Sequence, residues 1–192
     1  MLREELQNSD IPSRTTMRAR IHELLDGHLD QLEEEMQVQF PLLCDIGKMT
    51  SAQQKSVGKI SFTMDIWTDT NLLPFMAVTA HWIEATVEDT ANGPQKILKL
   101  RADLVGFHHM PGRHDGKHLA HAFILVTDRL DITEKVSNSN SFLCLRYLTD
   151  YALKIGWVTL DNASNNDTFM TTLERVLRHR RIPFKKTERR IR

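Results

Sequence analysis

The sequence predicts an α/β domain with a mixed sheet, preceded by an amphipathic helix. Two observations lead to this fold class. Three strand-like segments follow one another, the first of which alternates between apolar and polar residues, and a further strand-like segment then lies between two helical segments. Strands joined by short polar links are typical of an antiparallel meander, whereas helices flanking a strand are typical of an α/β sheet. The predicted order is helix, β, β, β, α, β, α.

The leading helix is predicted over residues 14–38. Hydroxyl side chains at residues 13–16 can cap its free N–H groups, and Pro41 follows its end. The acidic residues 33–35 are predicted to face solvent. The opposite, apolar face consists of residues at helical spacing: Met17, Ile21, Leu24, Leu25, His28, Leu32 and Met36.

Three strands are predicted next. Residues 60–66 alternate between apolar and polar side chains, which places Asp65 on the polar face of a half-buried strand. Residues 75–84 and 96–108 form the second and third strands. Residues 86–95 are predicted to be a turn, because they are polar and contain Gly93 followed by proline.

The second half of the chain predicts a helix, a strand and a helix. The helices cover residues 115–130 and 163–180, and each has one apolar face. Residues 157–160 between them are mostly apolar, as a strand buried on both faces would be. Polar residues around the start of the second helix are predicted to cap it: Asn162, Ser164 and Asn165.

Composition is that of a globular protein. A length of 192 residues fits one domain, or one domain with a helical extension, and 41% hydrophobic and 26% charged residues are ordinary values. No apolar run is long enough to span a bilayer, and residues 1–6 do not resemble a secretory signal. Cys44 and Cys144 are isolated, so no disulfide framework or metal-binding CxxC pair is indicated. An intracellular protein is expected, with neither a membrane nor a small-molecule substrate as its partner.

Two aspartates lie within strand-like runs that each end in polar residues. Asp65 lies in Lys59-Ile-Ser-Phe-Thr-Met-Asp-Ile-Trp-Thr-Asp69, and Asp161 lies in Gly156-Trp-Val-Thr-Leu-Asp-Asn-Ala-Ser-Asn-Asn166. Hard cations such as Mg²⁺ need carboxylate oxygens on rigid elements, and two such ions can clamp the reacting oxygens of a phosphoryl transfer. The pair therefore predicts a metal-dependent nuclease or strand-transfer site. Asp69 could supply a further oxygen, but a role in a turn is preferred.

The C-terminal part of the chain is basic although the net charge is zero. Such a segment can contact phosphates, and the alternative is a solvated helix face followed by an exposed terminus. The predicted nucleic-acid-binding residues are Arg178, Arg180, Arg181, Lys185, Lys186, Arg189, Arg190 and Arg192.

Three histidines have spacing that zinc ligands can have on a helix. His114, His118 and His121 lie at i, i+4 and i+7. No second cluster of soft ligands in the sequence completes a tetrahedral site, so zinc is not expected.

Five blocks of the sequence stand out in order, namely Ser13-Arg-Thr-Thr-Met17, Ser61-Phe-Thr-Met-Asp-Ile-Trp-Thr-Asp69, Pro74-Phe-Met-Ala-Val-Thr-Ala-His-Trp82, His114-Asp-Gly-Lys-His-Leu-Ala120 and Val158-Thr-Leu-Asp-Asn-Ala-Ser-Asn-Asn166. Together they resemble the catalytic region of hAT-superfamily transposases, including the RICESLEEPER-like proteins. The resemblance covers most of the chain from residue 13 onward. It implies a ribonuclease-H-like fold.

The resemblance also implies a chemistry. Asp65 and Asp161 match the first and second catalytic aspartates of the family, which hold divalent ions (Mg²⁺ or Mn²⁺) together with a later glutamate. Those ions activate water and then a DNA 3′-hydroxyl for phosphodiester cleavage and strand transfer. DNA is accordingly the implied partner, and the nucleus is favoured over the cytoplasm as the location.

The sequence departs from the family pattern in its extent. The chain stops at Arg192, where the family continues, so we expect the fifth strand, the insertion domain, the catalytic glutamate and the dimerisation region to be missing. We therefore expect no activity as it stands and no homo-oligomer. No Cys/His cluster corresponds to the family's N-terminal zinc finger.

Residues 137–155 look foreign to the family. Joining residue 136 directly to Gly156 restores a family-like sequence, and the segment opens with the low-complexity run Ser-Asn-Ser-Asn-Ser. One hypothesis is a retained, translated intron, and the alternative is a natural surface insertion, which chains tolerate well. Transcript reads that are never spliced across this stretch would exclude the intron.

These interpretations divide the chain into a helical extension (1–50), a partial ribonuclease-H-like domain (51–182) and a basic tail (183–192). The leading hypothesis is a truncated, inactive transposase catalytic domain. The alternatives are a non-catalytic nucleic-acid-binding or protein-interaction module, and a product without a selected role that does not fold stably.

Overall fold

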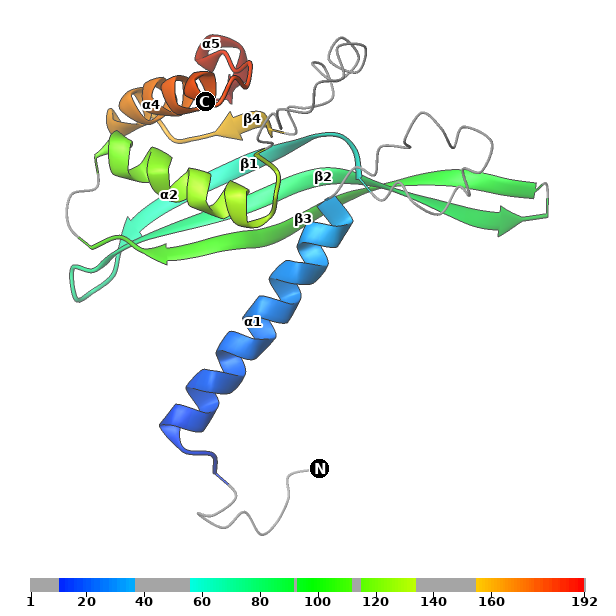
Figure 1. Ribbon diagram of the computed structural model, residues 1–192, viewed down its shortest axis with the longest axis horizontal. Helices are drawn as coiled ribbons and strands as arrows, with labels where there is room; N and C mark the ends of the chain where they lie inside the picture. The colour runs from blue at the N-terminus through cyan, green and yellow to red at the C-terminus, as the bar shows by residue number, and fades with distance from the viewer. Residues whose placement is uncertain (1–10, 37–55, 92, 112–114, 134–154, 192) are drawn as a thin grey trace.

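The computed structural model describes residues 11–36, 56–91, 93–111, 115–133 and 155–191 (Figure 1). Within these ranges the predicted order of elements is confirmed, and a short helix and a short strand follow the last predicted helix. The fold is a mixed α/β sheet with helices, preceded by a long helix. The predictions for residues 137–154, for Cys44 and Cys144, and for Arg192 concern residues outside the described ranges.

The sheet has five strands in the order β3-β2-β1-β4-β5. Strands β1 (Ser56–Thr68), β2 (Pro74–Thr90) and β3 (Gly93–His109) form the antiparallel meander. Strand β4 (Ile155–Thr159) lies parallel to β1, and β5 (Arg190–Ile191) lies parallel to β4. Three antiparallel strands followed by a helix and a parallel strand are compatible with the ribonuclease-H-like fold that the resemblance implies.

Helices α2 (Gly116–Arg129) and α4 (Asn165–His179) pack against each other over one face of the sheet (Figure 1). Asp115 caps α2 by accepting from the backbone N–H groups of its first turn. The short helix α5 (Lys186–Arg189) leads into β5. The opposite face of the sheet carries no helix among the described residues, so polar side chains on that face are open to solvent.

The core lies between the sheet and the two packed helices. Fully buried aromatic rings interlock there, since Phe62 meets Phe123 edge to face at 5.1 Å and Phe123 meets Phe169 at 5.7 Å. Such edge-to-face pairs stabilise a core beyond their buried area. Alternate residues of β1 and β2 supply the sheet side of the core: Ile60, Phe62, Met64, Met76, Val78, Ala80 and Trp82.

Helix α1 (Arg14–Met36) forms as predicted, but the prediction for its apolar face was only partly right. Met17 and Ile21 are 50% and 61% exposed, whereas Leu32 and Met36 are buried in the core. Figure 1 shows the reason, because the N-terminal half of α1 projects away from the sheet. Helical spacing identifies an apolar face but not what covers it.

The acidic end of α1 was also predicted wrongly at one residue. Glu35 is buried and does not face solvent. Its carboxylate accepts from Gln31 and pairs with Arg101 at 3.3 Å, and Arg101 in turn lies 5.6 Å over the ring of Trp82. The guanidinium compensates the burial of the carboxylate, so Glu35 fastens α1 to β3.

The turn between β2 and β3 is much shorter than predicted. Residues 86–90 and 93–95 continue the two strands, with Val87 opposite Lys96 and Thr90 opposite Gly93. Gly93 begins β3 with a φ of 100°, which suits glycine. Residues 86–95 were predicted to form a loop because they are polar. However, the hairpin extends past the rest of the sheet (Figure 1), so both of its faces are largely exposed and can carry polar side chains.

The β4–β5 side of the sheet corrects two further predictions. Trp157 is 44% exposed, so β4 is buried on one face only. The fifth strand is not missing, because Arg190–Ile191 pairs with β4 in parallel. Ile155, placed at the end of the foreign segment, is a buried residue of β4 opposite Ile60. No helix in the described part of the chain is long and apolar enough to cross a membrane.

Candidate active site

Asp65 lies in β1, and Asp161 lies two residues beyond the end of the neighbouring parallel strand β4. Strand β1 pairs with β4 so that Thr63 is opposite Thr159. Asp65 and Asp161 each follow that pair by two residues (65 − 63 = 2 and 161 − 159 = 2). Because adjacent strands lie about 4.8 Å apart, this register brings the two positions together at one end of the sheet.

Asp65 is an exposed residue on the open face of β1. The alternation along β1 turns Phe62 and Met64 into the core and Thr63 and Asp65 to the other face. Ala77 is the residue opposite Asp65 on β2, and its small side chain leaves space beside the carboxylate. Among the described residues, the Asp65 carboxylate makes no hydrogen bond or ion pair.

Asp161 is held in place by the start of α4. Its Oδ1 accepts from the backbone N–H of Ala163 at 3.0 Å and from Nδ2 of Asn166 at 2.5 Å. The same amide group of Asn166 also donates to the backbone carbonyl of Asp161 at 3.0 Å. Asn166 is buried, so it fixes both the backbone and one carboxylate oxygen of Asp161. Ser164, which was predicted to cap the helix, makes no capping hydrogen bond through its side chain.

Both aspartates line one depression of about 360 Å³ at this end of the sheet. A row of hydroxyl side chains from three strands forms its floor, namely Thr79, Thr63 and Thr159, which are neighbours in the register. Thr63 Oγ1 also lies 2.8 Å from Nε2 of His81. Sequence reasoning missed these threonines, although Thr63 and Thr159 each lie two residues before an aspartate and are therefore expected on the same face.

Aromatic side chains border the site on the open face. Trp67 lies on the Asp65 face of β1 and is 37% exposed. Its ring stacks on Phe75 at 6.0 Å and meets Phe107 at 5.5 Å. Trp67 therefore packs within an exposed cluster.

Asp69 has the turn role that was preferred for it. Its carboxylate accepts from the backbone N–H groups of Asn71 and Leu73, at 2.9 and 2.7 Å. These bonds close the turn between β1 and β2, in which Leu72 has a φ of 60°. Asp69 thus shapes the chain beyond the site and does not line the depression.

The histidines of α2 have local partners. His118 Nδ1 lies 2.8 Å from Asp115, and His121 Nδ1 lies 2.7 Å from the carbonyl of Lys117. The hydrogen bonds from His118 hold the pKa of Asp115 below its ordinary value. His114 lies outside the described residues. Within the described ranges, no group of three or more histidine, cysteine or acidic side chains is placed to hold a metal ion.

Most of the basic side chains that were predicted to bind nucleic acid have partners within the protein. Arg180 donates twice to Asp128, which raises the pKa of Arg180. Ion pairs in the described C-terminal part of the chain are Arg178 with Glu174, Arg180 with Asp128, Lys185 with Glu188, and Arg190 with Asp167. Two of these pairs join different elements, since Arg180 links the end of α4 to α2 and Arg190 links β5 to α4. All four reduce the charge that these side chains present to phosphates.

The remaining predicted basic residues have varied surroundings. Arg189 lies 5.4 Å over the ring of Trp157, and Lys186 donates to Thr171 at 2.9 Å. Arg181 is exposed and follows the C-terminal end of α4 with a φ of 62°. The structure therefore brings Asp65 and Asp161 together but distributes the basic residues over several contacts.

Comparison with known proteins adds a relationship to this geometry. The chain is 31% identical over 121 residues to two proteins of Zea mays, described as AC transposase and AC9 transposase. These two matches support a relationship to the hAT transposases. The matched segment is 63% of this chain but only 11% and 10% of the two relatives.

The hAT relationship rests on sequence similarity together with the fold. No protein-family model matches the chain. No solved structure matches it either. Because the match covers about a tenth of each hAT relative, the activity, substrates and partners of a whole transposase do not transfer with the relationship.

Proposed function

We propose that this chain carries part of a cation-dependent DNA cleavage and strand-transfer site of the hAT type. In this proposal Asp65 and Asp161 are two of its acidic ligands. The register of β1 and β4 is the observation that carries the proposal, because it places two carboxylates at one sheet end beside a common depression. The relationship to transposases supports the same assignment.

The donor set fits a hard divalent cation. Mg²⁺ is commonly held by one or two carboxylates, with water completing its coordination. Asp65 offers a carboxylate without a protein partner among the described residues, and Asp161 offers one whose Oδ1 is already oriented by Asn166. A bound cation would neutralise phosphate charge and lower the pKa of an attacking water or hydroxyl. The protein's own contribution is to hold both carboxylates at one fixed separation.

We further propose that the 192-residue chain alone binds Mg²⁺ or Mn²⁺ weakly and does not cleave DNA. The described residues bring together two carboxylates at the site, and the resemblance implies that a glutamate completes it. Two carboxylates leave more of the cation's coordination to water, which lowers affinity and leaves its position less defined.

Binding of Mn²⁺ tests the proposal without any need for activity. Electron paramagnetic resonance of free Mn²⁺ should detect weak binding to the purified chain, and Asp65→Asn or Asp161→Asn should abolish most of it. If both carboxylates share one ion, the double variant should lose little more than either single variant. Asp89→Asn is the charge-matched control, since Asp89 is exposed in the outer part of β2.

Equal Mn²⁺ binding by the control and by both site variants would overturn the metal assignment. A DNA-nicking assay with Mn²⁺ completes the design, and no turnover is expected from the chain alone. Turnover that disappears with Asp65→Asn would overturn the proposed inactivity but retain the site.

DNA is the proposed partner and the nucleus the proposed location, both on the strength of the transposase relationship.

A second candidate function is a non-catalytic nucleic-acid-binding or protein-interaction module. The basic side chains around α4 and α5 favour nucleic-acid binding, and Arg189→Ala with Arg190→Ala should weaken salt-dependent DNA binding. Binding that does not change with salt concentration would count against that function.

A further inference from the structure

Two adjacent depressions run along the outer face of α4. One has a volume of about 400 Å³ and lies between α4 and the α5–β5 segment, and the other has about 350 Å³ and reaches the start of α2. Both are lined by Asp167 and Thr171, so they form one continuous surface. We call this surface the α4 groove, and its charged members are Lys117, Asp167, Arg175, Lys186 and Arg190.

The α4 groove is strongly basic. Four of its charged side chains are cations and one is a carboxylate, which gives a net charge of 4 − 1 = +3. Asp167 is paired with Arg190, so the negative charge inside the groove is locally compensated. Lys117 and Arg175 are exposed, and neither makes an ion pair among the described residues. The surface therefore favours an anionic ligand.

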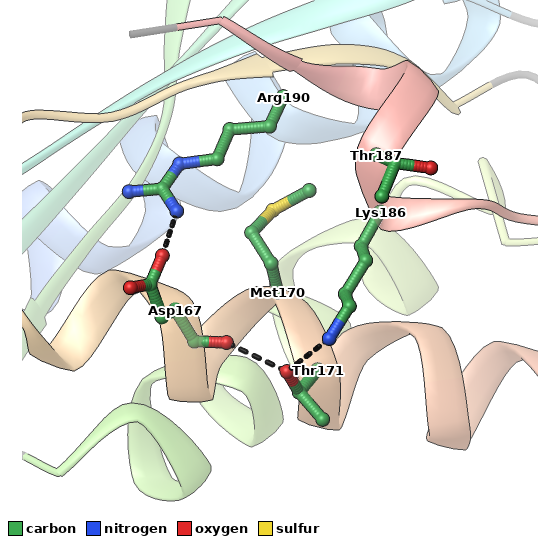
Figure 2. A pocket seen from close by; sticks show the side chains of 6 residues that line it. All are labelled: Asp167, Met170, Thr171, Lys186, Thr187 and Arg190. Carbon is green, nitrogen blue, oxygen red and sulfur yellow. Dashed lines mark hydrogen bonds and ion pairs between the residues drawn. The ribbon is translucent and has the colours of Figure 1, made fainter.

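The hydrogen-bonding groups of the groove are arranged on either side of Met170. Figure 2 shows Arg190 and Lys186 extending from the α5–β5 segment onto α4. Lys186 Nζ donates to Thr171 Oγ1 at 2.9 Å, and Thr171 donates to the carbonyl of Asp167 at 2.8 Å. The Nε of Arg190 is buried and has no partner among the described residues, so it is not accessible to a ligand. Donors outnumber acceptors here, as oxygen-rich anions require.

The groove begins close to the candidate metal site. Helix α4 starts four residues after Asp161 (165 − 161 = 4), and Asp167 lies in its first turn. At 1.5 Å per residue, the stretch of α4 from Asp167 to Arg175 is about 12 Å long. That length equals about three to four nucleotides of one strand at a rise of 3.4 Å. A backbone lying in the groove would thus reach the start of α4, where Asn166 holds the carboxylate of Asp161.

We propose that the α4 groove binds the phosphate backbone of a DNA strand and directs it to the Asp65–Asp161 pair. This inference rests on the proposed function, since it names the surface that positions the DNA at that site. Lys117, Arg175 and Lys186 contact phosphate oxygens. Arg190 holds the α5–β5 segment against α4 through Asp167.

The test measures DNA binding by fluorescence anisotropy of a labelled duplex across a series of NaCl concentrations. EDTA is present throughout, so the readout does not depend on cation binding. The test variant is Lys117→Ala/Arg175→Ala/Lys186→Ala. The charge-matched control is Arg14→Ala/Arg18→Ala/Lys96→Ala, which removes three exposed cations from α1 and β3. Thermal unfolding followed by circular dichroism checks that both variants fold.

The groove variant should bind more weakly, and the slope of log affinity against log salt should become less negative by about 2.7, at about 0.9 for each lost phosphate contact. The control should keep most of the original slope. An equal loss in both variants, or an unchanged slope in the groove variant, would overturn the assignment. Release of DNA by millimolar inorganic phosphate at constant ionic strength would also overturn it, by indicating a site for a free anion.

The two proposals fail in distinguishable ways. Loss of Mn²⁺ binding in Asp65→Asn tests the carboxylates without DNA, whereas binding in EDTA tests the groove without cations. DNA binding that survives in Asp65→Asn but falls in the groove variant is the combined result expected.

Discussion

At the residue scale, the candidate site depends on two aspartates that each lie two residues beyond Thr63 and Thr159, which are paired across neighbouring strands. The pairing of Asp65 with Asp161 could be predicted, because strand-end carboxylates of adjacent parallel strands meet at one sheet edge. The role of Asn166 in fixing Asp161 could not, because its amide was one of several polar residues at a helix start. Burial distinguishes Asn166 from its neighbours, and burial depends on how α4 packs.

His108 should make folding stability depend on pH. Burial under α2 and the nearby charge of Arg129 lower the pKa of His108 from 6.5. The unfolded chain therefore binds a proton at a higher pH than the folded chain. The free energy of unfolding should be unaffected by this group above about pH 6.5 and should fall as the pH drops from there through the folded-state pKa.

Urea denaturation at a series of pH values measures this effect. His108→Gln should reduce the fall in the free energy of unfolding below pH 6.5. His109→Gln leaves His108 in place, so the fall should be the same as in the unmodified chain. A decline of equal size in His108→Gln would show that other groups cause it.

Two glycines should respond in opposite directions to alanine. A Cβ at Gly116 would meet the carbonyl oxygen of Asn165 and the backbone nitrogen of Phe169, both at 2.3 Å. Gly116→Ala should therefore force α2 and α4 apart and cost about 1–3 kcal/mol. A Cβ at Gly27 meets nothing within 4 Å, so Gly27→Ala should stabilise α1 by as much as about 1 kcal/mol. Chemical denaturation of both variants measures the pair, and a stable Gly116→Ala would contradict the close packing.

At the element scale, α2 and α4 end in the same way. Each is followed by a residue in the left-handed region, Asp131 with a φ of 48° and Arg181 with a φ of 62°. The next N–H then bonds back into the helix, from Ile132 to Thr127 and from Ile182 to Leu177, both at 2.9 Å. Glycine is the usual residue at this position, and a side chain there costs about 1 kcal/mol.

Arg181→Gly should therefore raise the free energy of unfolding by about 0.5–1 kcal/mol. Asp131→Gly should gain less, because aspartate tolerates the left-handed region better than arginine. Thermal and urea unfolding of the two variants provide the comparison. A destabilising Arg181→Gly would mean that the arginine side chain makes a contribution that exceeds the backbone strain.

Elements with a complete local signal were predicted well, and elements whose limits depend on their surroundings were not. The cap at Asp115 and the apolar face of α2 lie within a few residues of each other, so the sequence contains both. The length of the β2–β3 hairpin does not have such a signal. Its outer part is exposed and polar, and only cross-strand hydrogen bonds distinguish it from a loop. The apolar side chains in the first half of α1 are likewise exposed, and helical spacing in the sequence does not show whether another element covers them.

At the scale of the whole molecule, one core joins the sheet to α2, α4 and the end of α1. Such a core predicts a single cooperative unfolding transition. The N-terminal half of α1 and the outer hairpin contribute little to that core. Their amide hydrogens should exchange by local opening at nearly no free-energy cost, whereas those of β1 and α4 should require global unfolding.

Hydrogen–deuterium exchange followed by mass spectrometry tests this distribution. Peptides from residues 14–25 and 86–99 should exchange early, and peptides from 60–66 and 169–177 late. Equal protection along all of α1 would indicate that its exposed half has a partner in solution. Unfolding without a cooperative transition would instead support the hypothesis that the chain does not fold stably.

The pairing of β1 with β4 also has a consequence for how this gene can change. Asp65 and Asp161 are 161 − 65 = 96 residues apart in the chain, yet the register of β1 with β4 and the start of α4 place them beside one depression. Codons gained or lost between α2 and β4 alter a loop-closure entropy that grows only with the logarithm of length. They do not move one carboxylate relative to the other. The geometry of the site is thus insulated from insertions and deletions there, and substitutions within the two strands are what would erode it.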